Sequence, residues 1–216
     1  MCGITGFFEE NGRDLPLKIE LMARRLAHRG PDDRGSWVDA DIGLALGHTR
    51  LAIVDLSPLG HQPMVSPSGR YVIVFNGEVY NFKILARELE SRGHTFQGGS
   101  DTEVILAAFE SWGIEQAVKR FIGMFAIAVW DRARQTMFMA RDRLGVKPFY
   151  YALLPDGMFI FGSELKSLRA HPGLPRDIDP RAVEDYFAYG YVPEPKTIFH
   201  NAYKLSPGYR ITLKTG

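Results

Sequence analysis

Cys2 is the residue with the clearest chemical potential, because it directly follows the initiator methionine and is the only cysteine among 216 residues. An initiator methionine is generally removed when a small residue follows it, so we expect the mature chain to begin at Cys2. Its thiol and its own α-amine then have ordinary pKa values of about 8.5 and about 7.7 to 8.0. Proton transfer between them costs only about 1 kcal/mol, so the amine can act as the base for a thiol nucleophile.

Cys2 and the dipeptide Asn76-Gly77 each allow a second interpretation. A free cysteine is often buried as a small apolar side chain. An Asn-Gly pair between apolar runs is typical of a tight hairpin turn. Alternatively, the side-chain amide of Asn76 and the backbone N–H of Gly77 donate hydrogen bonds to a carbonyl oxygen that becomes negative during a reaction.

Further charged residues are candidates for contact with a substrate. The guanidinium of Arg50 can bind a carboxylate with two hydrogen bonds. Alternatively, Arg50 is an ordinary surface arginine. Asp101 is suited to hold an ammonium group, or it is an acid in the first turn of a helix that stabilises the helix dipole. His28-Arg29 is better explained as a basic pair at the end of a helix than as a substrate contact.

The composition favours one compact domain that acts on a small molecule. Hydrophobic residues make up 45% of the chain, and 26 Lys and Arg against 25 Asp and Glu give a net charge of +1. This balance argues against nucleic acid or an anionic membrane as partner. The start of the chain has neither the basic region nor the apolar run of a signal peptide, and no apolar stretch is long enough to span a bilayer. We therefore expect a cytoplasmic protein without metal ligands.

The periodicity of apolar residues switches several times and predicts mixed α and β structure. An Asp-Pro pair begins the last predicted helix, and a Ser-x-x-Glu capping box begins the helix that carries Asp101. The predicted helices are residues 15–27, 82–92, 100–112 and 179–189. The predicted strands are residues 4–8, 43–46, 50–54, 71–75, 124–130, 136–140, 149–153, 158–161 and 209–213, of which the four from 124 to 161 form two hairpins.

Seven motifs, taken in order, resemble the N-terminal glutaminase domain of glutamine-dependent asparagine synthetases, which are class II glutamine amidotransferases. The motifs are Met1-Cys2-Gly3-Ile4, His28-Arg29-Gly30-Pro31-Asp32, Gly47-His48-Thr49-Arg50-Leu51-Ala52-Ile53-Val54-Asp55, His61-Gln62-Pro63-Met64, Phe75-Asn76-Gly77-Glu78-Val79-Tyr80-Asn81, Ser100-Asp101-Thr102-Glu103 and Ala140-Arg141-Asp142-Arg143-Leu144-Gly145-Val146-Lys147-Pro148. The resemblance implies an α+β fold, a four-layer αββα sandwich of two mainly antiparallel sheets, as in N-terminal-nucleophile hydrolases.

The resemblance also implies roles for individual residues. Cys2 attacks the side-chain amide of glutamine, Asn76 and Gly77 hold the oxyanion, Arg50 binds the α-carboxylate and Asp101 the α-ammonium. The rest of the pocket is formed by the backbone of the following residues: Leu51, Ala52, Ile53, Val54 and Glu78.

The resemblance predicts a glutaminase domain over residues 1–192 and a connector with one strand over residues 193–216. We expect a synthetase domain with ATP and Mg²⁺ beyond Thr215-Gly216, and a homodimer is possible for such a chain. The domain itself needs no cofactor. The acceptor of the ammonia, aspartate or another carboxylate such as a sugar acid, stays open. Two alternatives are a silent regulatory or interaction module that keeps Met1, and another amidotransferase or autoprocessing amide hydrolase.

Overall fold

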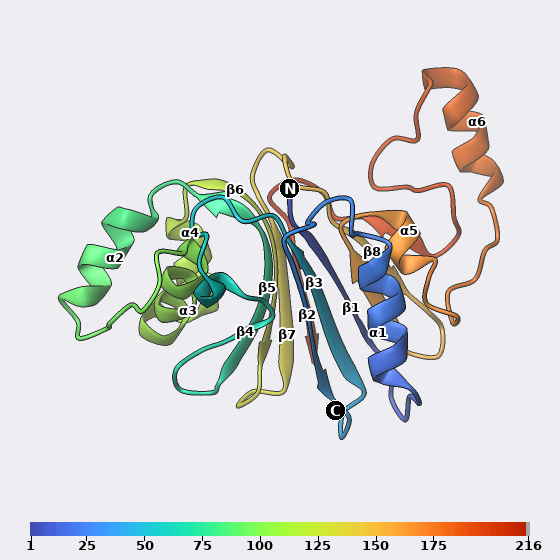
Figure 1. Ribbon diagram of the computed structural model, residues 1–216. Helices are drawn as coiled ribbons and strands as arrows, with labels where there is room; N and C mark the ends of the chain where they lie inside the picture. Colours follow the sequence, from blue (N-terminus) through green and yellow to red (C-terminus); the bar gives the residue numbers. More distant parts are fainter. Residues whose placement is uncertain (215–216) are drawn as a thin grey trace.

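Two antiparallel β-sheets pack face to face between two layers of helices (Figure 1) in the computed structural model, which describes residues 1–214. The strand order of the first sheet is β10-β8-β9-β1-β3-β2 and that of the second is β11-β7-β6-β5-β4. Thr215 and Gly216, the predicted junction to a further domain, lie outside the described residues. The strands are β1 (Gly3–Phe8), β2 (Asp33–Asp39), β3 (Leu44–Arg50), β4 (Met64–Val65), β5 (Tyr71–Val79), β6 (Gly123–Asp131), β7 (Thr136–Arg141), β8 (Tyr150–Leu153), β9 (Phe159–Gly162), β10 (Ala202–Lys204) and β11 (Arg210–Lys214).

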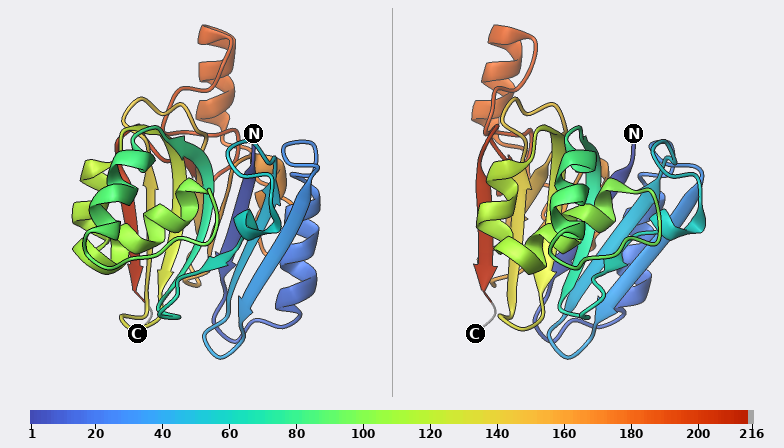
Figure 2. Two further views of the ribbon diagram at one scale, coloured as in Figure 1. Left: turned by 60° about the vertical axis from the view of Figure 1, so that its left-hand side comes forward. Right: turned by 90° about the vertical axis from the view of Figure 1, so that its left-hand side faces the viewer.

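The helices lie on the outer faces of the two sheets, as the two turned views show (Figure 2). Helices α1 and α5 contact the first sheet, whereas α3 packs on β5 of the second sheet and against its neighbours α2 and α4. Helix α6 projects from the body as an arm (Figure 1). The helices are α1 (Leu15–Arg24), α2 (Phe82–Glu90), α3 (Asp101–Trp112), α4 (Ile114–Arg120), α5 (Leu165–Leu168) and α6 (Pro180–Tyr189), with one 3-10 turn, η1 (Pro58–Gly60). The predicted four-layer sandwich is confirmed.

The central strands are apolar nearly throughout because both of their faces are covered. Along β5, Val74 faces the core between the sheets, while Ile73 and Phe75 face the helices. Along β1, Ile4 belongs to the core between the sheets and Phe7 to the core under α1. A strand with period-two side chains and two covered faces requires this continuous apolar run.

The structure corrects the interpretation of Asn76-Gly77 as a turn. β5 continues through both residues, with Asn76 opposite Ala126 and Gly77 opposite Phe125 on β6. A Cβ atom on Gly77 would lie 2.3 Å from the carbonyl oxygen of Met124, so the position requires glycine for close packing of two strands.

Other differences concern segments whose pattern is weak. The predicted strand 43–46 is longer in the structure, where β3 runs from Leu44 to Arg50. The predicted strand 50–54 was wrong, because the chain leaves the sheet after Arg50. β2 escaped prediction because it is an edge strand without buried positions. α4 was also missed, because Gly113, which ends α3, is at the same time the residue before α4.

Local capping signals correctly mark two helix starts. Ser100 accepts a hydrogen bond from the backbone N–H of Glu103 at the start of α3, and Asp179 accepts one from Arg181 at the start of α6. The Glu103 carboxylate does not close a reciprocal box, because it accepts from the backbone N–H groups of Gln97 and Gly98 instead. This contact fixes the loop that precedes Asp101.

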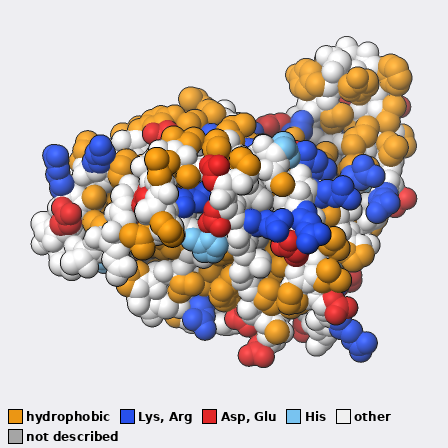
Figure 3. Space-filling view, in the orientation of Figure 1, with side chains coloured by type: hydrophobic (Ala, Val, Ile, Leu, Met, Phe, Trp, Pro, Cys, Tyr) orange, Lys and Arg blue, Asp and Glu red, His pale blue; other side chains and the backbone are white. Residues whose placement is uncertain are grey.

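The C-terminal segment contributes to both sheets. β10 pairs with β8 in the first sheet and β11 pairs with β7 in the second. Between α5 and β10, the arm carries exposed aromatic side chains that form part of the hydrophobic surface at the upper right of Figure 3. They are Tyr186, Phe187, Tyr189 and Tyr191. Within residues 1–214, no helix has both the length and the apolar character that crossing a membrane would demand.

We predict that Phe161→Ala lowers the free energy of unfolding by about 3–5 kcal/mol, the usual cost of removing a buried aromatic ring. Phe161 on β9 is 1% exposed, and its ring fills the space above Gly6 and stacks on Phe149. Urea denaturation measures the change. Leu153→Ala in the adjacent strand β8, where the side chain is 53% exposed, is the control and should change stability by less than about 0.5 kcal/mol. Equal losses in the two variants would contradict the prediction.

Candidate active site

Cys2 lies directly before β1, where that strand pairs with the end of β3. Its Sγ is 3.4 Å from the backbone nitrogen of Leu51, which donates a hydrogen bond to it, and 3.6 Å from the Leu51 carbonyl oxygen. One residue beyond β3 therefore holds the sulfur with both polar groups of its backbone.

The N-terminal segment is anchored by Arg29. Its Nε donates to the Cys2 carbonyl at 2.9 Å, and its Nη1 lies 3.0 Å from the carboxylate of Glu164. His28 contacts the same carboxylate. Burial would raise the pKa of Glu164, but the hydrogen bonds from the surrounding basic side chains outweigh it and lower that pKa to about 2. The basic pair 28–29 thus fixes the nucleophile's backbone. Met1 is 55% exposed beside it.

A cavity of about 100 Å³ opens at Cys2 between the two sheets, the 51–62 loop and the start of α3. All the site residues expected from the sequence line it except Ala52, whose backbone N–H donates to Asp32 instead. The lining residues are Met1, Cys2, Arg50, Leu51, Ile53, Val54, Asp55, Gly60, Gln62, Phe75, Asn76, Gly77, Glu78, Ser100, Asp101, Thr102, Met124 and Lys147.

Asn76 and Gly77 present hydrogen-bond donors at this cavity. Nδ2 of Asn76 is buried and has no hydrogen-bond partner among residues 1–214. In an extended strand, alternate backbone N–H groups point to the same edge. The N–H groups of Phe75 and Val79 point away from β6, to Gln62 and Asp101. The N–H of Gly77 between them points the same way.

Arg50 ends β3 with a buried guanidinium. Its Nη1 donates to the Ser57 carbonyl at 2.7 Å and its Nη2 donates to the Asp55 carbonyl. Gly60 packs on the guanidinium so closely that a Cβ atom would overlap it. The arginine therefore organises the 51–60 loop, and its other N–H groups remain for a carboxylate in the cavity.

Asp101 is 5% exposed at the first turn of α3 and accepts a hydrogen bond from Val79 N–H at 3.0 Å. Burial, together with the nearby charge of Glu78, raises the pKa of Asp101 to about 6. Desolvation outweighs the stabilising helix dipole here. The two carboxylates give this side of the cavity a negative charge suited to a cation.

Sequence analysis assigned no role to Gln62 and Lys147, although both lie in the motifs that carry the resemblance. Gln62 is buried, accepts from the backbone N–H of Phe75 at 2.7 Å and donates to Oγ1 of Thr102 at 3.2 Å. It thus joins β5 to α3. Lys147 enters the cavity from the loop between β7 and β8. Only the tertiary fold brings these residues to Cys2.

His48 on β3 joins the two sheets at this site. It is 1% exposed, and its Nε2 donates to the Phe75 carbonyl on β5 at 3.1 Å. Burial lowers the pKa of His48 to about 4, so the imidazole is neutral at pH 7.

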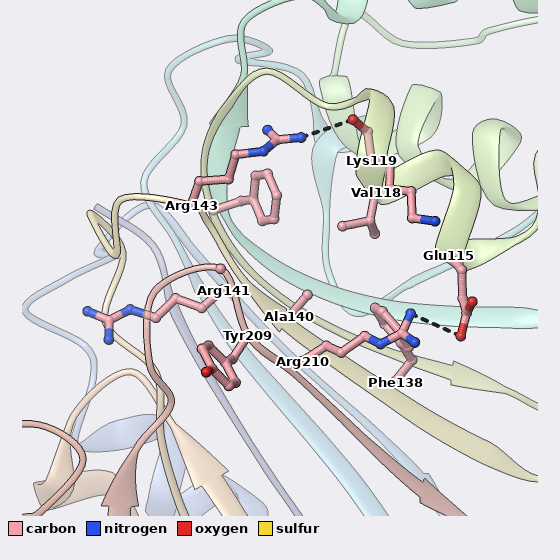
Figure 4. Close-up of a pocket in the computed structure, with 11 residues that line it drawn as sticks. Glu115, Val118, Lys119, Phe138, Ala140, Arg141, Arg143, Tyr209 and Arg210 are labelled. Carbon is pink, nitrogen blue, oxygen red and sulfur yellow. Dashed lines mark hydrogen bonds and ion pairs between the residues drawn. The ribbon is translucent and has the colours of Figure 1, made fainter.

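A second hollow, of about 450 Å³, lies between α4, β7 and β11 (Figure 4) and shares no residue with the Cys2 cavity. Its cations are engaged: Arg143 donates to the Lys119 carbonyl, and Arg210 pairs with Glu115. Among residues 1–214, no group of three or more His, Cys, Asp or Glu is arranged to hold a metal ion.

Two antiparallel sheets between helical layers, with a cysteine before the central strand β1, form the fold of N-terminal-nucleophile hydrolases. The whole chain, residues 1–216, matches the family described as glutamine amidotransferase domain, and the chain belongs to that family. The predicted resemblance to class II amidotransferases of the asparagine synthetase type is confirmed.

Several relatives carry the name asparagine synthetase. The chain is 40% identical, over 99% of its length, to glutamine-hydrolyzing asparagine synthetase 3 of Bacillus subtilis, and it spans 35% of that protein. It is 37% identical to asparagine synthetase 1 of the same organism over 99% of its length, spanning 34% of that relative. Amidase chry2 of Gibberella zeae is 33% identical over 99% of the chain, which spans 32% of it. The chain thus spans about a third of these relatives.

The fold is also that of a solved structure. Glutamine phosphoribosylpyrophosphate amidotransferase from Bacillus subtilis superposes with a TM-score of 0.67 at 21% identity, over 78% of this chain and 43% of that chain. This likeness shows the shared fold.

We predict that acid destabilises the protein through His48. The folded pKa of about 4 lies below the ordinary value of 6.5, so the unfolded state binds more protons between these pH values. Stability therefore falls as the pH drops from 6.5 to 4, by roughly 3 kcal/mol for this group. Urea unfolding of wild type and His48→Gln at pH 7 and pH 4.5 measures it. The variant should lose less stability between the two pH values, and parallel losses would contradict the assignment.

Proposed function

We propose that this chain hydrolyses the side-chain amide of glutamine, with Cys2 as the nucleophile. One observation carries the proposal: Nδ2 of Asn76, which is buried and has no partner among residues 1–214, borders the cavity that contains Cys2 Sγ. The N–H of Gly77 points away from β6 beside it. A nucleophile beside such donors is the arrangement that stabilises a tetrahedral carbonyl adduct. Membership in the glutamine amidotransferase family supports glutamine as the substrate.

The first step forms a bond from Sγ of Cys2 to the amide carbon of glutamine. The thiol proton passes to the α-amine of Cys2, which removal of Met1 frees, and the carbonyl electron pair moves onto the oxygen. Asn76 and Gly77 donate to this oxyanion, a contribution typically worth about 100-fold to 1000-fold per donor. The amine then gives its proton to the leaving nitrogen, the C–N bond breaks, and ammonia departs from a thioester.

Water completes the reaction. It adds to the thioester carbon while the α-amine of Cys2 takes one of its protons, and the same two donors hold the second oxyanion. The carbon–sulfur bond then breaks to release glutamate, and the Cys2 sulfur recovers a proton from the amine. The site favours a neutral amide over a carboxylate, because oxyanion donors and a thiolate both suit an uncharged carbonyl.

The charges of the cavity match the backbone groups of an amino acid. Arg50 binds the α-carboxylate through the N–H groups that Ser57 and Asp55 leave free. Asp101 and Glu78 hold the α-ammonium on the opposite side. The ends of the substrate are thereby fixed by groups of opposite sign, and its amide reaches Cys2.

The proposal also concerns the molecule that receives the ammonia. The names of several relatives and the third of their length that the chain spans support a domain of an asparagine synthetase-like enzyme. The predicted boundary at residue 192 does not separate two bodies, because β10 and β11 complete the two sheets of the glutaminase domain. In the proposed enzyme, an ATP- and Mg²⁺-dependent domain transfers the ammonia to aspartate. The alternative acceptor is another carboxylate, such as a sugar acid.

A silent module of the same fold is the second candidate, because Met1 lines the cavity. A retained methionine would place an amide where the reaction needs an amine. Intact mass before and after treatment with an electrophilic glutamine analogue separates the two. Loss of Met1 with a single adduct on Cys2 supports the enzyme, and a retained Met1 without adduct supports the module.

We predict that Cys2→Ala abolishes release of glutamate from glutamine. The variant should still fold, so its unfolding midpoint in urea should differ from the wild-type value only by the small amount expected for a small change of side-chain volume. The substitution removes only the sulfur, and with it two long hydrogen bonds to the Leu51 backbone at the cavity. A coupled assay for glutamate measures the activity. Turnover that persists in the alanine variant would refute Cys2 as the nucleophile.

We predict that KM for glutamine rises as the pH falls below about 6, because Asp101 becomes protonated and loses its charge. Asp101→Asn should raise KM about tenfold or more and remove this pH dependence, since a charged hydrogen bond is worth about 1.5–3 kcal/mol. Glu110→Gln, in the same helix but outside the cavity, is the matched control. Wild-type KM in the asparagine variant would exclude Asp101 from the site.

A further inference from the structure

Lys147 is a cation of the cavity that the proposed reaction does not use. The residue is 6% exposed and lines the same cavity as Cys2. Among residues 1–214, no hydrogen-bond acceptor or carboxylate contacts its Nζ. Its ammonium is therefore open to the cavity and unpaired, which indicates a charge that pairs only when the site works.

The backbone holds Lys147 firmly in this position. Asp142 is 1% exposed, and its Oδ2 accepts from the Lys147 N–H at 3.0 Å. Nε of Arg141 donates to the Lys147 carbonyl at 2.8 Å. Asp142 also accepts from the N–H groups of Leu144 and Val146, so one buried carboxylate organises the whole loop. The cavity therefore receives a lysine whose main chain is fixed on both sides.

The other cations near Cys2 already have partners. Arg29 from the segment after α1 pairs with Glu164, and Arg50 from β3 is held by carbonyl groups of the 51–60 loop. The acids that line the cavity are Asp55 in the 51–60 loop, Glu78 at the end of β5 and Asp101 at the start of α3. The Asp55 carboxylate accepts from the N–H groups of Ser57 and Gly99. Among residues 1–214, none of these acids forms an ion pair with Lys147 within 4.0 Å.

We propose that the Lys147 ammonium is the counter-ion of the Cys2 thiolate and holds it ready for attack, because both residues line one cavity. The inference rests on the proposed function and adds a positioning residue to it. The α-amine of Cys2 still takes the thiol proton, and Lys147 stabilises the negative sulfur that this transfer leaves. A cation within about 4–6 Å of a thiol typically lowers its pKa.

The electrostatics of Lys147 agree with this pairing. Burial and the neighbouring charge of Arg29 lower the pKa of Lys147, and the charge of Cys2 is the main influence that opposes them. The charges of Asp142 and Glu78 act in the same direction as that of Cys2.

The test uses the fact that the chain contains one cysteine, so alkylation by iodoacetamide reports on Cys2 alone. The alkylation rate is measured by intact mass between pH 5.5 and 9.5 for wild type, Lys147→Met and Lys147→Arg. Methionine keeps the length without the charge, and arginine keeps the charge. We expect the midpoint for the methionine variant to move up by about one pH unit, which lowers the rate at pH 7 about tenfold. The arginine variant should stay near the wild-type midpoint.

The variants are compared by the midpoint of the alkylation rate against pH and not by its plateau. The plateau also depends on the intrinsic reactivity of the thiolate, which changes with its pKa. Coincident midpoints for wild type and Lys147→Met would overturn the proposal, as would an equal shift in both variants, which indicates a purely structural role. Glutamine hydrolysis by the wild type is measured separately. Its absence would refute the proposed function while leaving the comparison of thiol pKa values intact.

Discussion

The hydrogen bond from Nε2 of His48 to the carbonyl of Phe75 crosses between the two sheets inside the protein. Two residues after His48, the chain reaches Arg50, and the residue after Phe75 is Asn76. The same contact therefore sets the distance between the strand that holds Cys2 through Leu51 and the strand that carries the proposed oxyanion donors. Apolar packing keeps the sheets together, but it is not directional. The buried hydrogen bond adds the direction, because a misaligned pair would leave two buried polar groups unsatisfied.

The candidate site is a place where polar groups are buried for a purpose other than stability. Burial raises the pKa of Asp101, lowers that of Lys147 and leaves the amide donor of Asn76 without a partner. Each of these states costs free energy in the folded chain. They occur together around one cavity, at the edge of a core that is otherwise apolar. The sandwich supplies the stability that such a site requires, through cores on both faces of each sheet.

The loops around the cavity are held by backbone hydrogen bonds of charged side chains. Arg50 holds the 51–60 loop, Glu103 holds the turn before α3, and Asp142 holds the loop that ends in Lys147. Asp55 connects the first two, because its carboxylate accepts from the Gly99 N–H at 2.9 Å. Segments without regular structure thus acquire fixed positions beside the nucleophile. Charged side chains in these motifs therefore fix the positions of the loops around the cavity.

The sequence by itself determined the central strands, the two hairpins, the capped helices and the position of Cys2, since these depend on local patterns: apolar periodicity, capping residues and the place of one cysteine in the chain. It also contained the motifs that identify the family. The tertiary structure alone decided that Asn76-Gly77 continues a strand, because the long partner strand β6 overrides the local preference for a turn. It alone showed the edge strand β2, the role of Arg29 as an anchor of Cys2, and the approach of Lys147. Those features arise from contacts between segments far apart in the chain, and no local pattern encodes them.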